Sequence, residues 1–345
     1  MLAALSATPA ATDTAVDERA VIVDTDIFHD PDDAIMLITA ARTVESLIVV
    51  TADEVPAPDS GDGLRARAAR LLLDGLGRHD VPVITGASLG GHRISLSHAL
   101  LTELPRAPRF DLDDLLDRLR ARIEQTTQPV RWLGCGTMTN LAELLLAAPH
   151  LAEQIELVQM GGWLDPDRDR HPGRASHNLS LDPTSAGTVL RMLPKVRLVL
   201  SEHTAAEQIR VGPQWPLYQR LTGPNAPGWA QLPGANIAIW CLTRSGSWMH
   251  GPLTLSAALD LGFVRFRPER IRIAEDAHLS TDPAGRAVQV SDSVDYDSFL
   301  DWLESETATT PATPAEPAHG AKNTDPRTKQ HRRHESVLPR IGARS

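Results

Sequence analysis

Short apolar runs alternate with longer segments of helical periodicity up to about residue 200 of the chain. Runs such as Ala20–Val23 are typical of strands that are buried on both faces of a sheet. The segments between the runs repeat apolar residues every three or four positions, as amphipathic helices do. This alternation predicts an α/β fold, with an open, mostly parallel sheet flanked by helices in a single large domain.

The predicted elements follow one another without an internal repeat. We expect strands at residues 20–23, 47–51, 81–84, 130–133, 155–160 and 196–200. We expect helices at residues 32–41, 64–76, 112–124 and 140–147, and a further helix that begins near residue 182. For that helix, Asp182 is a favourable N-cap residue and Pro183 suits the first turn.

Composition changes at both ends of the chain. Residues 1–18 are small and polar, and residues 306–345 are first rich in Thr, Pro and Ala and then basic. Such segments bury too little apolar surface to order themselves, so we expect both to be disordered and the folded domain to span residues 19–305. The basic cluster at residues 331–334 is interpreted as part of a solvated tail, with an acidic partner or nucleic acid as the alternative.

The formal net charge of −10 argues against a protein that binds a phosphate backbone and favours a neutral or cationic small substrate, or a metal. The two cysteines, Cys135 and Cys241, are too few for a disulfide framework and are interpreted as reduced core residues. No apolar run reaches the roughly 18 residues of a membrane span, and the N-terminus lacks the basic region of a secretory signal. We therefore expect a cytoplasmic protein that binds neither nucleic acid nor membrane.

Five aspartates follow the first predicted strand within ten residues: Asp24, Asp26, Asp30, Asp32 and Asp33. So many carboxylates cannot lie close together, partly out of water, and all stay ionised unless a cation compensates them. Calcium or magnesium, which prefer oxygen ligands, would supply that charge at the carboxyl end of a strand. The alternative is an acidic helix N-terminus with Asp30 as its cap, which explains three aspartates but not Asp24 and Asp26.

The segment around these aspartates resembles the N-terminal motif of the calcium-dependent nucleoside hydrolases of the inosine–uridine type, in the variant with two extra residues before the Asp-Asp pair. Further segments resemble motifs of this family in the same order: residues 48–54, 65–86, 134–142, 158–162, 177–183 and 249–256. The resemblance covers about residues 20–275. It implies hydrolysis of the N-glycosidic bond of a ribonucleoside or modified nucleoside to free base and ribose, through a metal-activated water.

The resemblance also implies a ligand set for Ca²⁺. Asp26 matches a metal ligand that is also the water-activating base, and Asp33 matches a bidentate metal ligand. Thr139 matches a residue that ligates the ion through its backbone carbonyl, although its side chain could instead cap the helix near residue 140. Asp24 matches a supporting carboxylate, and the role of Asp30, which lies in the two-residue insertion, stays open.

Other matched residues are implied to contact the substrate. Asp32 and Asn178 match residues that bind ribose hydroxyls, and Glu54 occupies a ribose-contacting position where many members carry Asn. For Asn178 the alternative is an Asx-turn before Asp182. His250 matches a histidine suited to protonating or orienting the leaving base, with a purely structural histidine as the alternative. The family further implies a small-molecule nucleoside as partner and a homo-oligomer.

Three residues depart from the family pattern. Gly251 stands where an aspartate ligates calcium, and its lost carboxylate is expected to weaken calcium binding. Phe28 stands where a glycine adopts a backbone conformation that other residues tolerate poorly. Ser176 stands where many members have a Glu that contacts a ribose hydroxyl. Either Asp30 or Glu54 could supply the missing charge.

Two other functions stay open at this point. The departures are compatible with a relative that binds a nucleoside without turnover. The pattern Asp24-x-Asp26 after an apolar strand also resembles the haloacid-dehalogenase phosphatases, but Phe28 stands where those enzymes have Thr or Val. Three tryptophans near the matched segments, Trp163, Trp240 and Trp248, are expected to pack in the core, with stacking on a base as the alternative.

Overall fold

The structure is a computed structural model that describes residues 19–53, 63–89 and 111–308. Three expectations lie outside these residues: the role of Glu54, the disorder of residues 1–18, and the basic tail from residue 309 onward. Within the described part, no helix is long and apolar enough to cross a membrane.

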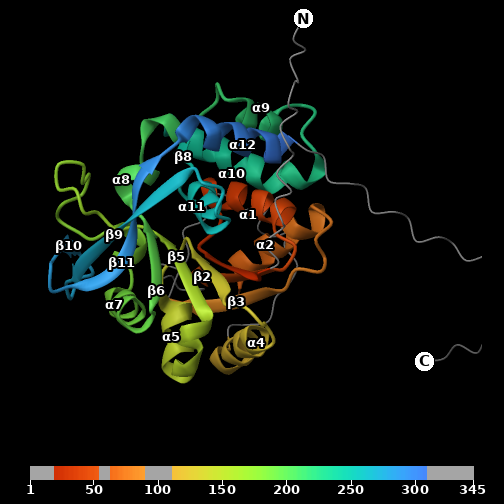
Figure 1. Ribbon diagram of the computed structural model, residues 1–345. Coiled ribbons are helices and arrows are strands. Elements are labelled where there is room, and N and C mark those ends of the chain that lie inside the picture. The colour runs from red at the N-terminus through yellow and green to blue at the C-terminus, as the bar shows by residue number, and fades with distance from the viewer. Residues whose placement is uncertain (1–18, 54–62, 90–110, 309–345) are drawn as a thin grey trace, which may run out of the picture. The chain divides into compact units, whose positions relative to one another are not determined.

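A sheet of nine strands forms the centre of the described domain (Figure 1). The strands are β1 (Val21–Thr25), β2 (Leu47–Asp53), β3 (Val83–Ser88), β4 (Val130–Gly134), β5 (Ile155–Met160), β6 (Lys195–Val199), β9 (Val264–Ile273), β10 (Leu279–Thr281) and β11 (Arg286–Val294). Their order is β10-β9-β11-β6-β5-β4-β1-β2-β3. All neighbours from β3 to β11 are parallel, whereas β9 pairs antiparallel with both β11 and β10. The predicted α/β class with a mostly parallel sheet is confirmed.

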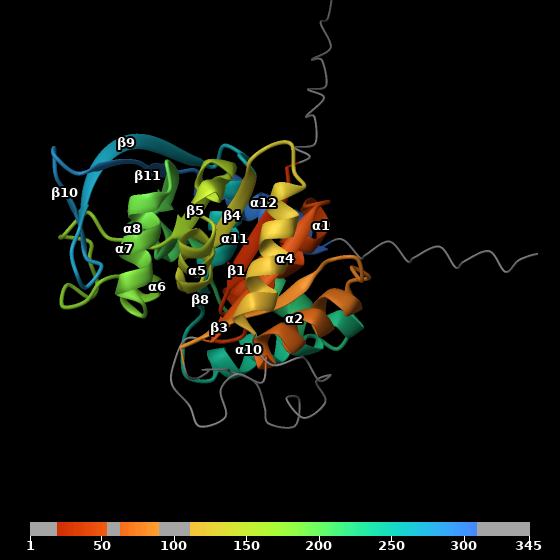
Figure 2. The ribbon, with the colours of Figure 1, turned by 90° about the horizontal axis from the view of Figure 1, so that it is seen from below.

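Helices cover both faces of this sheet (Figure 2). The α-helices are α1 (Asp32–Thr43), α2 (Leu64–Gly75), α4 (Leu112–Glu124), α5 (Thr139–Ala147), α6 (His177–Ser180), α7 (Pro183–Met192), α8 (Ser201–Thr204), α9 (Pro216–Thr222), α10 (Gln231–Cys241), α11 (His250–Ala258) and α12 (Tyr296–Ala308). Helices α4, α5 and α7 pack on one face, and α1, α2 and α9–α12 pack on the other, so that two separate apolar clusters sandwich the sheet. A small sheet joins β7 (Arg210–Val211) to β8 (Ser247–Trp248).

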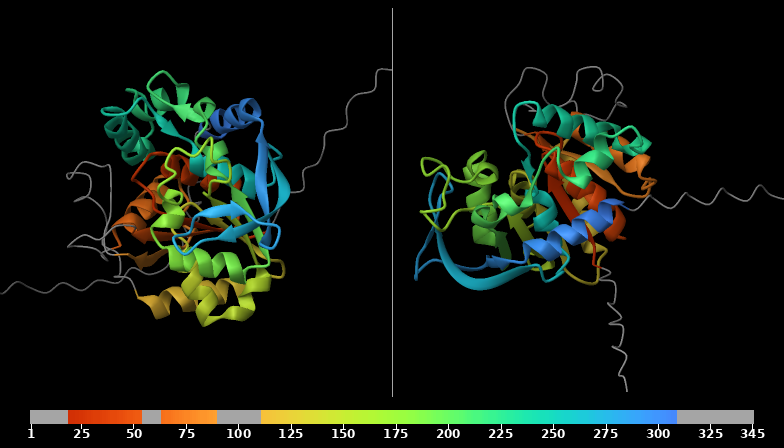
Figure 3. Two further views of the ribbon diagram at one scale, coloured as in Figure 1. Left: turned by 90° about the vertical axis from the view of Figure 1, so that its left-hand side faces the viewer. Right: turned by 90° about the horizontal axis from the view of Figure 1, so that it is seen from above.

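The elements expected before residue 200 occur within a few residues of their predicted bounds. As predicted, Asp182 caps α7, because its side chain accepts a hydrogen bond from Ser185 N at 3.1 Å and Pro183 opens the helix. Helix α12 continues to Ala308, three residues past the expected end of the domain at residue 305. Figure 3 shows β9 and β11, in cyan to blue, as a long curved pair at one edge of the domain, which the pattern of apolar runs did not predict.

The strand order reverses between β1 and β4. The chain runs from β1 outward to β2 and β3, and then returns to place β4, β5 and β6 on the other side of β1. Ligands in open α/β sheets bind in the crevice at such a reversal, outside the carboxyl ends of the strands. The loop with Asp26 follows β1 there, and Cys135 follows β4, with its amide donating to Asp24 O at 2.8 Å.

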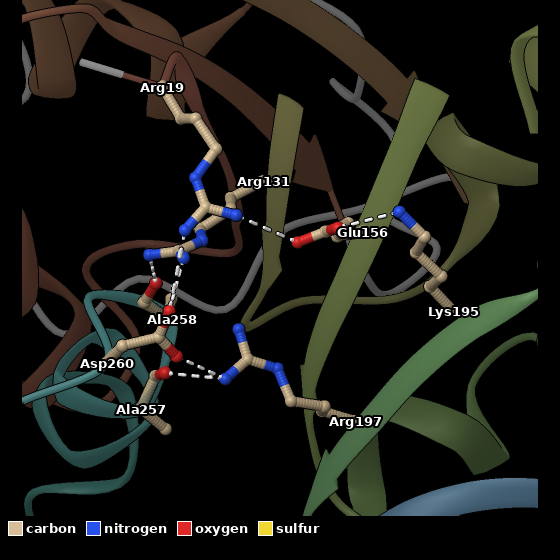
Figure 4. A network of polar contacts seen from close by, with 8 residues as sticks. All are labelled: Arg19, Arg131, Glu156, Lys195, Arg197, Ala257, Ala258 and Asp260. Atoms are coloured by element: carbon tan, nitrogen blue, oxygen red, sulfur yellow. Dashed lines mark hydrogen bonds and ion pairs between the residues drawn. The ribbon is translucent and has the colours of Figure 1, made fainter. Parts of the chain in front are cut away.

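Helix α11 runs across the centre of the domain, and its C-terminus is fixed by arginines from the interior strands β4 and β6 (Figure 4). Asp260 ends the helix with a φ of 54°. Buried Arg131 donates to the carbonyl of Ala258 and to the carboxylate of Asp260. Arg197 donates to Asp260 at 2.6 Å and to Ala257 O at 3.1 Å. These contacts satisfy the last carbonyls of the helix and direct its N-terminus toward the carboxyl ends of the strands.

Candidate active site

One cavity of about 440 Å³ opens at the carboxyl ends of β1 and β4. It is lined by Asp26, His29, Asp30, Asp32, Asp33, Cys135, Met160, His171, Arg174, His177, Asn178, Trp240, Arg244, Trp248, His250 and Gly251. Four of the five aspartates that the sequence singled out therefore face the same space. Such a concave site with a few convergent polar groups is the usual form of a small-molecule site.

Two of these carboxylates are held by specific hydrogen bonds. Thr25, the last residue of β1, donates its hydroxyl to Asp33 Oδ2 at 2.6 Å. The amide of Gly251 donates to Asp32 Oδ2 at 2.8 Å. That amide belongs to the first turn of α11, where unpaired N–H groups and the helix dipole favour an anion. The N-termini of α1 and α11 thus meet at the acidic cluster.

The carboxylates also disfavour one another's charge. The pKa values of Asp32 and Asp33 are raised well above the ordinary value, first by burial and then by neighbouring carboxylates, with Asp26 and Asp30 acting on both. The hydrogen bonds from Gly251 to Asp32 and from Thr25 to Asp33 oppose these shifts without offsetting them. A cluster of this kind is stabilised by a positive charge from outside the protein.

Asp24 lies behind the cluster and is almost fully buried. Its pKa is raised to about 7, chiefly by burial, while a hydrogen bond from Asn140 at 2.8 Å opposes the shift. Asn140 also accepts from Ala87 N at 2.7 Å and donates to Thr51 O at 3.3 Å, so its amide joins the carboxyl ends of β1, β2 and β3. Asn140 was noted in the sequence only as part of a motif, without this role.

A second residue that sequence reasoning missed is Arg65. Its guanidinium is fully buried and donates to the backbone carbonyls of Asp26 and Ile27. The side chain therefore fixes the loop that presents Asp26, instead of forming a surface ion pair. An arginine among the apolar residues of α2 is the only signal that the sequence gives for this buried role.

Thr139 and Asn178 occupy different surroundings. Asn178 lines the cavity and donates its amide to Cys135 O at 2.8 Å, which is not the alternative Asx-turn. The Thr139 side chain donates to Asp182 Oδ2 at 2.7 Å. The alternative in which Thr139 caps α5 is wrong, because Met138 is the N-cap residue and no side chain bonds there. Thr139 does not line the cavity.

His250 lies at the N-terminus of α11, with its Nδ1 2.9 Å from Thr204 Oγ1 and its ring tilted over Trp248 at a centroid distance of 6.3 Å. The pKa of His250 is lowered to about 4, chiefly by burial; Asp30 opposes the shift, and Arg170 and His177 add to it. The ring is therefore neutral near pH 7, which favours orienting the leaving group over protonating it as an imidazolium.

The three departures have distinct structural consequences. A Cβ added at Gly251 would lie 2.7 Å from Asp33 Oδ1 and 3.4 Å from Asp32 Oδ2, so a side chain there would point into the acidic cluster. Phe28 has a φ of 74°, the conformation that favours glycine, and its ring is fully buried in the core. The Ser176 hydroxyl accepts from Gly162 N at 2.7 Å and does not line the cavity.

The structure also gives the positions of Asp30 and of the three tryptophans near the matched segments. Asp30 lines the cavity but does not cap α1, because Pro31 is the N-cap residue and no side-chain bond is made there. Trp240 and Trp248 line the cavity, whereas Trp163 does not. In the described part of the chain, no group of three or more His, Cys, Asp or Glu side chains is arranged to hold a metal ion.

Comparison with known proteins identifies the relatives of this chain. Its sequence matches the inosine-uridine preferring nucleoside hydrolase family over residues 21–301. The pyrimidine-specific ribonucleoside hydrolase RihA of Shewanella woodyi is 28% identical over 185 residues, which are 50% of this chain and 57% of that protein. RihA of Shewanella baltica is 28% identical over 184 residues, 50% of this chain and 56% of that protein. The matched part thus spans little more than half the length of these relatives.

Solved structures share the fold. The inosine-uridine preferring nucleoside hydrolase of Bacillus anthracis superposes with a TM-score of 0.65 at 18% identity, covering 84% of this chain and 99% of that one. The purine-preferring ribonucleoside hydrolase of Gardnerella vaginalis gives 0.63 at 20% identity, covering 84% and 98%. Because the family match extends over most of the chain, this protein belongs to the inosine–uridine preferring nucleoside hydrolase family.

Proposed function

We propose that this protein hydrolyses the N-glycosidic bond of a ribonucleoside, giving free base and ribose. The observation that carries the proposal is that Asp26, Asp32 and Asp33 face one cavity at the strand reversal, in a chain of this family. Relatives are named for pyrimidine-specific and for purine-preferring activity, so both kinds of base are candidates.

Members of this family are metalloenzymes, and we propose Ca²⁺ for this chain. The donors fit a hard cation, because they are buried carboxylates that raise one another's pKa. Asp26 and Asp33, which line the cavity, would hold the ion. The Thr139 carbonyl is proposed as a further ligand on the family resemblance alone, because Thr139 does not line the cavity. When bound, the ion would lower the pKa of a coordinated water and so make it a nucleophile at neutral pH.

The protein's own residues would then perform the remaining steps. Asp26 accepts the proton of the attacking water, and Asp32 and Asn178 accept or donate hydrogen bonds to the ribose hydroxyls. Neutral His250 directs its free ring nitrogen at the leaving base, since its Nδ1 is engaged with Thr204. Asp24, tied to Asn140, supports the strand end behind Asp26.

A panel of purine and pyrimidine ribonucleosides, assayed for released ribose with calcium or with a chelator, tests this function. We expect release that the chelator abolishes, and a loss of about 100-fold or more in kcat for Asp26→Asn. Asp117→Asn, an exposed aspartate on α4, is the matched control and should retain full activity. Folded wild-type protein that releases no ribose in calcium would contradict the proposal.

The same assay decides between the competing functions. Gly251 and the lack of a converged metal site among the described residues favour, as second candidate, a relative that binds nucleosides without turnover. Thermal stabilisation by a nucleoside without ribose release would support it. Release of phosphate from p-nitrophenyl phosphate would support the phosphatase alternative, which the family assignment disfavours.

The cytoplasmic location and the homo-oligomer also remain part of the proposal. Light scattering coupled to size-exclusion chromatography measures the mass of the particle directly. A single 37.4 kDa particle would contradict the oligomer and would leave the proposed chemistry unaffected.

A further inference from the structure

The active-site cavity has two parts of opposite charge. The carboxylates of Asp26, Asp32 and Asp33 form its inner part, at the ends of β1 and α1. Arg174, from the segment before α6, and Arg244, from the segment after α10, line the same cavity and are exposed. A neutral nucleoside has no group that requires these two guanidinium ions.

Within the described ranges, no carboxylate pairs with Arg174 or Arg244, whereas neighbouring Arg170 and Arg210 both pair with Glu207, at 3.6 and 2.7 Å. The charge of Arg174 and Arg244 is therefore available to a ligand.

The position of Arg244 is fixed before any ligand arrives. Its guanidinium carbon lies 3.8 Å from the centroid of the Trp240 ring, a close cation–π contact. Trp240 is itself held by a hydrogen bond to Gly246 O at 3.1 Å and by the edge-on ring of His29 at 5.5 Å. A guanidinium held in this way binds a phosphate or carboxylate with two parallel hydrogen bonds at little entropic cost.

We propose that the substrate carries an anionic group, a phosphate on the sugar or a carboxylate on the base, that Arg174 and Arg244 bind while the carboxylate side of the cavity takes the ribose diol. This inference rests on the proposed function and narrows its substrate class. It replaces the neutral or cationic substrate that the net charge of the whole chain suggested, because the charge at the cavity mouth is opposite to that of the chain.

Matched substrates test the inference. We would measure kcat/KM, in calcium, for uridine, uridine 5′-monophosphate and 6-carboxyuridine, and for inosine and inosine 5′-monophosphate. We expect an anionic member to exceed its neutral counterpart by about tenfold or more, and the preferred member locates the charge on the sugar or on the base. Arg174→Gln and Arg244→Gln should each raise KM for the anionic substrate by roughly tenfold, with kcat and the neutral substrate little changed.

Arg191→Gln is the matched control, since Arg191 is an exposed arginine on α7 that does not line the cavity. It should leave kcat and KM for every substrate unchanged. Neutral substrates that are hydrolysed as well as anionic ones, with no effect of Arg174→Gln or Arg244→Gln, would overturn the inference and leave the proposed function standing.

A binding measurement distinguishes failure of the proposed hydrolysis from failure of the proposed anion site. If no substrate is hydrolysed, the proposed function fails, and thermal shifts with ribose and ribose 5-phosphate still test the anion site. A larger stabilisation by ribose 5-phosphate or by uridine 5′-monophosphate than by its neutral counterpart, lost in Arg174→Gln and Arg244→Gln but kept in Arg191→Gln, supports the site. Equal shifts for the neutral and the anionic members of these pairs, and for uridine and 6-carboxyuridine, overturn it.

Discussion

At the residue scale, the site depends on side chains that differ in how far the sequence reveals them. The aspartates could be predicted from the sequence, because all five lie within one short segment. Asn140 and Arg65 could not, because their partners Asp24 and Asp26 O are 116 and 39 residues away in sequence and meet them only in the folded sheet. Local pattern identifies the acidic side chains that line this cavity better than it identifies the residues that hold them in place.

At Phe28 we expect glycine to give a more stable protein than alanine, which is the reverse of the usual order. Its left-handed backbone strains any residue with a Cβ, while its buried ring contributes to the core. We expect Phe28→Ala to lower the free energy of unfolding by about 3–5 kcal/mol, and Phe28→Gly to be about 1 kcal/mol more stable than the alanine variant. Urea denaturation measures both. At Ala34, inside α1, glycine should instead be about 1 kcal/mol less stable than alanine, which makes Ala34→Gly the control.

The second residue-scale prediction concerns Gly251. Because a Cβ there lies 2.7 Å from Asp33 Oδ1, Gly251→Asp adds a carboxylate to a cluster that already lacks compensation. In chelator, we expect this variant to melt at a lower temperature than the wild type. By calorimetry, we expect it to bind calcium about tenfold more tightly than the wild type, or more. Gly251→Asn has nearly the same shape without the charge and should gain much less affinity. If neither variant binds calcium more tightly, residue 251 lies outside the coordination sphere of the ion.

At the scale of elements, apolar runs predicted the strands that are buried on both faces of the sheet. The pattern of apolar positions did not predict the half-exposed strand β9 or the buried helix α11. In β9 exposed and partly buried positions dominate and arginines recur, so its sequence has no continuous apolar run. Helix α11 is buried at every residue after His250, so no amphipathic stripe marks it. The sequence match over residues 249–256 placed this segment at the site, but not its function as the helix that brings Gly251 to Asp32.

The anchoring of α11 gives a prediction for this element. Arg131 is almost fully buried and bonds both the Ala258 carbonyl and Asp260 at the end of the helix. Arg131→Met removes the donor to the Ala258 carbonyl and one of the donors to Asp260, and should lower the free energy of unfolding by about 2–4 kcal/mol in denaturant titrations. Arg118→Met on α4 breaks only an exposed pair with Asp114 and should cost under about 0.5 kcal/mol. Similar losses in the two variants would show that Arg131 does not hold the helix.

At the scale of the whole molecule, the strand reversal between β1 and β4 explains why motifs from distant parts of the chain meet in one cavity. The alternation of strands and helices predicted a parallel sheet, but the order of its strands is a property of the fold, so the pattern alone could not show that β1 and β4 are neighbours. The net charge of the whole chain did not predict the charge of the cavity lining. Exposed arginines and buried aspartates line the same cavity.

At this scale we predict that the free energy of unfolding contributed by His250 is lost in acid. The pKa of His250 is about 4 in the folded protein and near 6.5 when unfolded, so between these values the unfolded chain binds more protons. His250 therefore contributes stability that is complete above pH 6.5 and is lost as the pH falls toward 4, at most about 3 kcal/mol. His250→Gln should reduce the difference in unfolding free energy between pH 7 and pH 4.5. An unchanged difference would contradict a depressed pKa.

The buried ring of Phe28 ties the loop that carries Asp26 and Asp30 to the apolar core beneath it. Such a loop cannot swing open by itself, because its movement would withdraw a large side chain from close packing. Its amide protons should therefore exchange with solvent only when the entire domain unfolds, at the slow rate of the core strands. Recognition at this site would then follow lock-and-key behaviour, with shape set during folding and not by the arriving molecule.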